Sequence, residues 1–202
     1  MDFKISAELV KQLREKTGAG MMNCKKVLQE NEGNFDKAIE SLRQKGLAFA
    51  DKKGVRKTSE GIIESYIHTG GKLGVLVEVN CETDFVARRP EFQQLVKDIA
   101  MQIAACPDVN YVSITDIPIS VIEREKNIEA NKKDLNNKSD QIKSKIVEGR
   151  IDKILRTQSL LDQMYIRDNT KTIEELIKQT IAQIGENIKI TLFIRFQLGK
   201  EL

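Results

Sequence analysis

The spacing of apolar residues changes near residue 55, and this change is what most restricts the possible folds. Before it, apolar side chains recur at the three- and four-residue steps of helices. After it, residues 62–68 and 73–79 have the pattern of two strands joined by the turn 69–72. A chain that switches from helical to strand period is expected to form an α+β protein with two parts.

Residues 6–50 carry the helical pattern in three short segments. Ser6 and Asn34 suit helix N-termini, because their side-chain oxygens can accept an unpaired first-turn amide. Gly18 and Gly20 interrupt the pattern between the first two segments. A basic stretch at 52–57 then reads as a linker. We therefore predict three short helices within residues 6–50.

The remaining residues, 56–202, predict an antiparallel sheet covered on one face by helices. A helix of about four turns should begin at Pro90, which suits a first helical turn because it lacks an amide hydrogen. A second helix is expected over 172–184, with Gly185 as its stop. A half-buried strand should follow and pair with the hairpin, because apolar residues occupy alternate positions: Ile188, Ile190, Leu192, Ile194, Phe196 and Leu198.

Between these elements, residues 120–156 carry dense alternating charge around a thin apolar seam. The sevenfold spacing of Val121, Ile128 and Leu135 is typical of a two-helix coiled coil, with residues 136–139 as its tip. We expect a helical coiled-coil hairpin inserted at 119–157.

Composition excludes several classes of chemistry. The 33 Lys and Arg against 30 Asp and Glu give a net charge of only +3, which makes nucleic acid a poor candidate partner. A single histidine, His68, rules out triads and multi-histidine metal sites, and three scattered cysteines predict neither disulfides nor zinc. The glycines at 18–20 and 70–71 lack phosphate-loop spacing. We expect no cofactor, no metal, no covalent catalysis and no membrane segment.

Residues 81–86, with the sequence CETDFV, differ from the rest of the chain. They place an acid, an aromatic and a β-branched residue at the end of a strand, shortly before Pro90. An isolated phenylalanine such as Phe85 usually belongs to a core. An aromatic flanked by Glu82 and Asp84 at an element boundary also fits a docking site on a partner protein.

Two long stretches, 13–28 (LREKTGAGMMNCKKVL) and 78–88 (EVNCETDFVAR), resemble the signatures of the elongation factor Ts family. Shorter similarities lie at 147–150, 160–163 and 193–196, so the resemblance covers nearly the whole chain. It implies that residues 1–55 form a ubiquitin-associated-like domain that docks on the GTPase elongation factor Tu. Residues 56–202 would form an α+β dimerisation domain carrying the coiled-coil hairpin.

The resemblance also implies a function and its residues. The chain would be a guanine nucleotide exchange factor that binds the GDP form of elongation factor Tu, displaces magnesium and lets GTP bind. Phe85 would be the wedge of a magnesium-dislocating group made of Thr83, Asp84, Phe85 and Val86. The N-terminal docking residues would be Leu13, Arg14, Thr17, Gly18, Ala19, Gly20, Met21 and Met22.

The short chain has no room for a second core subdomain, so the resemblance implies a homodimer that binds two GTPases in a 2:2 complex. Abundant Lys, Asn and Ile and the lack of an Arg- and Ser-rich leader favour a soluble factor of a bacterial cytoplasm or, if plastid-encoded, a plastid stroma. A helical scaffold or ubiquitin-like-binding adaptor is the alternative, but it leaves residues 83–86 unexplained. A phosphate-handling enzyme is a further alternative, and it would show turnover without any GTPase. An RNA-binding protein is another, and its affinity for RNA would depend steeply on salt.

Overall fold

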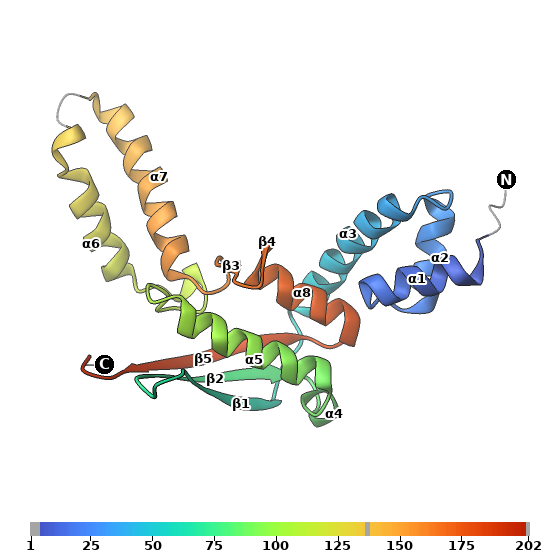
Figure 1. Cartoon of the computed structure of the whole chain (residues 1–202). Helices are drawn as coiled ribbons and strands as arrows, with labels where there is room; N and C mark the ends of the chain where they lie inside the picture. Colours follow the sequence, from blue (N-terminus) through green and yellow to red (C-terminus); the bar gives the residue numbers. More distant parts are fainter. Residues whose placement is uncertain (1–4, 136–137, 201–202) are drawn as a thin grey trace. The chain divides into compact units, whose positions relative to one another are not determined.

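The computed structural model describes residues 5–135 and 138–200, which form a mixed fold of helices and antiparallel strands (Figure 1). In chain order the first elements are α1 (Ala7–Thr17), α2 (Met21–Glu30), α3 (Phe35–Lys53), β1 (Glu60–Ile67), β2 (Leu73–Cys81), α4 (Asp84–Ala87) and α5 (Pro90–Ala105). Then follow η1 (Ile114–Asp116), α6 (Ile119–Ala130), η2 (Lys133–Leu135), α7 (Asp140–Gln158), β3 (Met164–Tyr165), β4 (Asp168–Thr172), α8 (Ile173–Ile184) and β5 (Ile188–Gln197). The predicted α+β class is confirmed at this level.

Contacts within the chain divide it into two compact units. The first comprises Met1–Ile63, Glu78–Val96 and Glu175–Ile190, and the second comprises Glu64–Val77, Lys97–Glu174 and Thr191–Leu202. Strands β1, β2 and β5 and helices α5 and α8 therefore contribute residues to both units.

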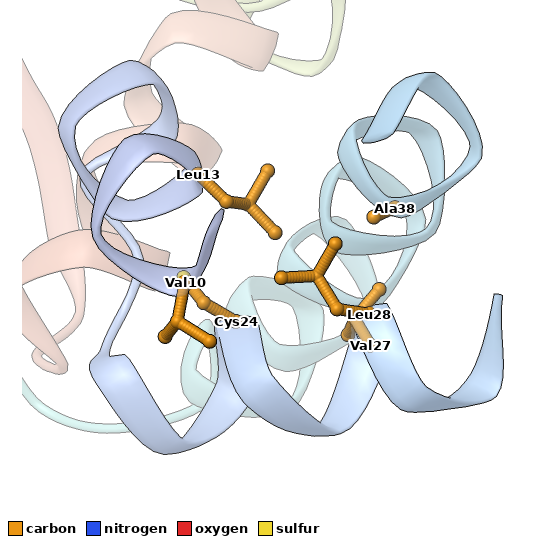
Figure 2. Packing of buried hydrophobic residues seen from close by; sticks show 6 residues of the cluster. All are labelled: Val10, Leu13, Cys24, Val27, Leu28 and Ala38. Atoms are coloured by element: carbon orange, nitrogen blue, oxygen red, sulfur yellow. The ribbon is translucent and has the colours of Figure 1, made fainter. Parts of the chain in front are cut away.

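Helices α1 to α3 in the first unit confirm the three helices expected near the N-terminus. Ser6 caps α1 by accepting the Leu9 amide at 3.2 Å, and Asn34 caps α3 by accepting the Lys37 amide at 3.0 Å, as predicted. Gly18 ends α1 with a left-handed φ of 68°. Figure 2 shows the small core that these helices enclose, made of Val10, Leu13, Cys24, Val27, Leu28 and Ala38.

The linker is shorter than predicted. Residues 52 and 53 belong to the last turn of α3 rather than to the connection, because an isolated glycine such as Gly46 is tolerated within a helix and no other glycine or proline follows before Gly54. Two ion pairs connect the middle and the end of α3 to α8 in the same unit. Arg43 contacts Glu175 at 2.8 Å, and Lys178 contacts Asp51 at 2.8 Å.

The predicted hairpin and its pairing with the last strand are confirmed, since the sheet order is β1-β2-β5. Strand β5 runs antiparallel to β2, because Asn187 bonds to Glu82 at one end and Leu198 bonds to Lys72 at the other. The predicted half-buried face of β5 is only partly right. Ile188 and Ile190 are buried, but the later members of the same series are 40 to 75% exposed: Leu192, Ile194, Phe196 and Leu198.

The alternation of β5 shifts by one residue at Thr191, so its second half turns a different set of side chains inward. Arg195 is one of these, and its guanidinium donates to the carbonyls of Ile103, Cys106 and Pro107 at the end of α5. Carbonyls at and just beyond the end of a helix lack partners within it, so an arginine satisfies them better than an aliphatic side chain would; the Cys106 carbonyl also accepts the Val109 amide at 3.3 Å. The sequence alternation alone does not reveal this exchange.

Helices α6 and α7 form the predicted helical hairpin (Figure 1), but the predicted sevenfold seam is wrong. Helix α6 ends at Ala130, Ile128 is 50% exposed, and Leu135 is buried in the short η2 turn rather than in the helix. The seam forms at the base of the hairpin from Ile117, Val121, Ile122, Val147, Ile151, Ile154 and Leu155. Part of the predicted tip, residues 136–137, lies outside the described residues.

The small antiparallel pair of β3 and β4 is not anticipated by the sequence pattern, because two and five residues are too short to show alternation. In the described residues, no helix combines the length and the apolar content needed to cross a bilayer.

Candidate functional site: an exposed aromatic tip

The segment at 83–87 is a single helical turn at the end of β2. Thr83 has extended backbone angles and caps α4, accepting the Val86 amide on its hydroxyl at 3.4 Å. The side chain of Phe85 is 79% exposed, whereas Val86 is 6% exposed and Ala87 is buried. Phe85 therefore lies at the surface and not in a core, as the docking interpretation requires.

Thr83 is held by a residue that lies far away in the sequence. Its amide donates to Glu186 Oε2 at 3.0 Å, and its hydroxyl donates to Glu186 Oε1 at 2.8 Å. From the other side, the Cys81 thiol donates to the Thr83 carbonyl at 3.1 Å. Burial, with a further contribution from the Glu186 charge, raises the pKa of Cys81 to about 11, so the thiol keeps the proton that it donates.

The residue before Thr83 is fixed in the same way. Glu82 accepts the Asn187 amide at 2.7 Å and pairs with Arg56 at 3.3 Å. The Asn187 amide is the main cause of a lowered pKa for Glu82, and Arg56 adds to it. The Asn187 side chain also donates to the carbonyls of Gly54 and Arg56, at 3.3 and 2.8 Å. The α8–β5 connection thus bonds both the tip and the start of the linker.

The four predicted tip residues differ in what they offer to a partner. Asp84 bonds to Arg88 at 2.9 Å in an exposed pair, so its carboxylate lies at the surface. Phe85 presents an apolar ring beside this charge. Val86 and the backbone of Thr83 point inward, which makes them supports of the turn in this conformation.

The N-terminal docking residues lie at the end of α1, in the turn and at the start of α2. Met21 and Met22 are 44% and 76% exposed, and Arg14 and Gly20 are exposed, whereas Leu13 is fully buried. Thr17 and Ala19 are half-buried, and the Thr17 hydroxyl donates to the Leu13 carbonyl at 2.7 Å. Leu13 therefore contributes to the core beneath this surface (Figure 2).

Several of the predicted docking residues lie next to Arg89 and Glu91, which follow the tip in the sequence. A hollow of about 550 Å³ within the first unit is lined by Lys11, Arg14, Glu15, Gly18, Ala19, Gly20, Arg89, Glu91 and Gln183. Four predicted docking residues thus share one surface with Arg89, which lies just beyond α4. Cys81 belongs to the segment 81–86 that the sequence marks, but Glu186 is not predicted as a site residue. No local signal marks Glu186, since its bonds to Thr83 span 103 residues.

Large exposed aromatic side chains on ordered turns are common anchors of protein–protein interfaces. Comparison with known proteins identifies the family. The model of the elongation factor Ts family matches residues 4–200. The chloroplastic elongation factor Ts of Guillardia theta is 64% identical over the whole chain and 92% of its own length.

Elongation factor Ts of the cyanobacterium Rippkaea orientalis is 64% identical over 98% of the chain and 79% of its own length. That of Synechocystis is 63% identical over 98% of the chain and 90% of its own length. The chain belongs to the elongation factor Ts family, the nucleotide exchange factors of translation elongation. The resemblance inferred from residues 13–28 and 78–88 is therefore confirmed.

Proposed function

We propose that this chain promotes GDP release from elongation factor Tu by inserting Phe85 next to the magnesium site of the GTPase. The observation that carries the proposal is the 79% exposure of Phe85 on a turn whose backbone is fixed by Glu186. A large apolar side chain is kept in water at a position where the turn beneath it is ordered. Such a residue is suited to binding a partner.

The GTPase holds GDP through backbone amides and a magnesium ion with a demanding geometry of about 2.0 to 2.1 Å to its oxygen ligands. Burying the Phe85 ring in the partner would contribute roughly 1.5 to 3 kcal/mol, which can offset a distortion of that site. Asp84, at the surface beside the ring, would engage polar groups. Because linkage is reciprocal, GTP binding then weakens the hold of the factor and releases it. The chain makes and breaks no covalent bond.

The helices over residues 1–55 would form a ubiquitin-associated-like docking domain that holds the GTPase while the tip acts. Met21 and Met22 support this role, because methionine side chains adapt their shape to a partner surface and both are exposed. Arg14 and the backbone of residues 18–20 line the adjoining hollow. The relatives in plastids and cyanobacteria support action in a plastid stroma or a bacterial cytoplasm.

Release of a fluorescent GDP analogue from elongation factor Tu tests the wedge directly. Phe85→Ala should lower the release rate at saturating factor by about tenfold to a hundredfold, the equivalent of the apolar burial it removes. Ile119→Ala is the control, because Ile119 is also a large apolar residue, 73% exposed, but lies on α6 outside both proposed contact regions. Wild-type rates for Phe85→Ala would refute the wedge.

Residues 56–202 would form a dimerisation domain with the hairpin at 119–157 as its insertion. A group of exposed apolar side chains on the sheet supports a homodimer, and hence a 2:2 complex. They lie within the second unit, on β2, on β5 and at the residue that follows β5: Leu76, Leu192, Ile194, Phe196 and Leu198. Ile194→Asp should convert a dimer to a monomer in light scattering, whereas Ile128→Asp, on α6, should not. A wild-type chain that is monomeric at micromolar concentration would refute this arrangement.

A further inference from the structure

The turn that carries Phe85 is too short to set its own direction. Helix α4 has four residues, and isolated helical segments of that length are unstable in water. Its orientation must therefore come from bonds to other parts of the chain. The question is which side chain supplies them.

Glu186 supplies two such bonds through a single carboxylate. Both oxygens of one carboxylate accept from one residue, Thr83, through its amide at 3.0 Å and its hydroxyl at 2.8 Å. Two bonds from a single planar group restrict rotation as well as distance, and the negative charge makes each bond stronger than a neutral one. The residue that begins α4 is thus fixed in both position and orientation.

Glu186 is itself held in place by the chain around it. Gly185 ends α8 in a left-handed conformation with φ of 91°, which directs the next residue away from the helix axis. Directly after it, the Asn187 amide bonds to Glu82 at 2.7 Å. Glu186 therefore lies between a fixed helix end and a fixed strand contact, so its carboxylate needs little additional ordering.

We propose that Glu186 is a positioning residue of nucleotide exchange, which holds Thr83 so that Phe85 points toward the partner. It does not touch the GTPase in this proposal and acts only through Thr83. The inference rests on the proposed function of Phe85. Glu186 lies outside both of the family-like signatures, which are residues 13–28 and residues 78–88.

The test compares three variants of the full chain in GDP release from elongation factor Tu, measured over a range of factor concentrations. Glu186→Ala removes both bonds to Thr83. Glu186→Gln keeps the shape, and its amide oxygen can accept the Thr83 amide hydrogen while its nitrogen donates to the hydroxyl oxygen. Asn187→Ala is the matched control, since it removes two side-chain bonds from the same connection without touching Thr83.

Glu186→Ala should lower the release rate at saturating factor by about tenfold, because small misplacements of a contact group have large effects on rate. Glu186→Gln should recover that rate to within about threefold, and Asn187→Ala should keep it. A merely structural role would reduce the amount of folded factor. That would shift the concentration needed for half-saturation and leave the saturating rate unchanged.

Two further readouts separate the possible failures. Hydrogen exchange at the Thr83 amide should accelerate in Glu186→Ala, and adding that substitution to Phe85→Ala should slow release no further. If Phe85→Ala slows release but Glu186→Ala does not, the positioning role is wrong and the wedge stands. If Phe85→Ala itself releases GDP at the wild-type rate, the proposed function fails instead. Should Glu186→Ala not fold, Glu186→Asp, which shortens the side chain by one carbon, gives the same test.

Discussion

Phe85 and Met22 have nearly equal exposure, 79% and 76%, yet the chain supports them in different ways. Met22 lies at the start of α2, whose N-cap, Gly20, forms no side-chain bond, and the turn before it depends on the short-range bonds of Thr17. Phe85 lies on a turn fixed by residues about a hundred positions away. Local bonds thus support the docking surface, and tertiary bonds support the tip.

The largest expected difference is in the stability lost when Gly61, near the tip, or Gly18, in the docking surface, is replaced by alanine. A Cβ on Gly61 would lie 2.2 Å from the Val79 carbonyl oxygen and 2.7 Å from the Asn80 Cα, in the strand that leads to the tip. Gly61 also has φ of 148°, so Gly61→Ala should destabilise the fold by about 3 kcal/mol or more. Gly18→Ala should cost only about 1 kcal/mol, since its added carbon meets the flexible end of Gln183 and the main penalty is its φ of 68°.

Urea unfolding of both variants measures this difference. Equal losses would mean that the backbone of β2 can move aside. The tip would then be less firmly built than the bonds around Thr83 indicate.

The threonines of the two regions give the next largest contrast. Thr83→Val removes the hydroxyl that donates to Glu186 and should cost about 2 kcal/mol, because a carboxylate loses a partner. Thr17→Val removes short-range bonds to Leu13 and Ala19 and should cost about 1 kcal/mol. Valine keeps the shape of threonine in both cases, so unfolding free energies compare the bonds alone. A larger loss for Thr17→Val would reverse the assignment of local and tertiary support.

This contrast also explains what the sequence could predict. The caps at Ser6 and Asn34, the stop at Gly18 and the hairpin over β1 and β2 depend on neighbouring residues, and each was predicted correctly. The tip sequence and the strand end before it stand out locally, but the bonds from Glu186 do not, because Glu186 has no local pattern that marks it as a partner of Thr83.

The same limit accounts for the errors. The alternation of β5 predicted one buried face, but it carried no information about the helix carbonyls that Arg195 satisfies. The sevenfold spacing at 121, 128 and 135 predicted one long seam, but the helix ends at Ala130. The first prediction failed because distant backbone carbonyls bind Arg195, and the second failed because the helix ends before the repeat is complete.

The smallest expected difference concerns two carboxylates, Glu82 near the tip and Glu30 in the N-terminal helices. The pKa of Glu82 is lowered mainly by the Asn187 amide, and that of Glu30 is lowered mainly by its hydrogen bond with Lys45. A lowered folded-state pKa adds stability above the unfolded value of about 4.3 and loses it as pH falls through the folded value. Each carboxylate should therefore stabilise the chain near neutral pH and lose its effect in acid.

Salt should weaken the stabilising effect of Glu30 more than that of Glu82. The Glu30 pair is exposed, whereas the Glu82 contact is a partly buried bond to a backbone amide. Unfolding free energies of Glu82→Gln and Glu30→Gln, measured from pH 3 to 7 in low and high salt, test this. Glu82→Gln should lose about 1 kcal/mol at neutral pH in both salts. Glu30→Gln should differ from the wild type only in low salt. A loss for Glu82→Gln that disappears in high salt would show that Arg56, rather than the Asn187 amide, holds Glu82, and the tip would then depend partly on screened surface charge.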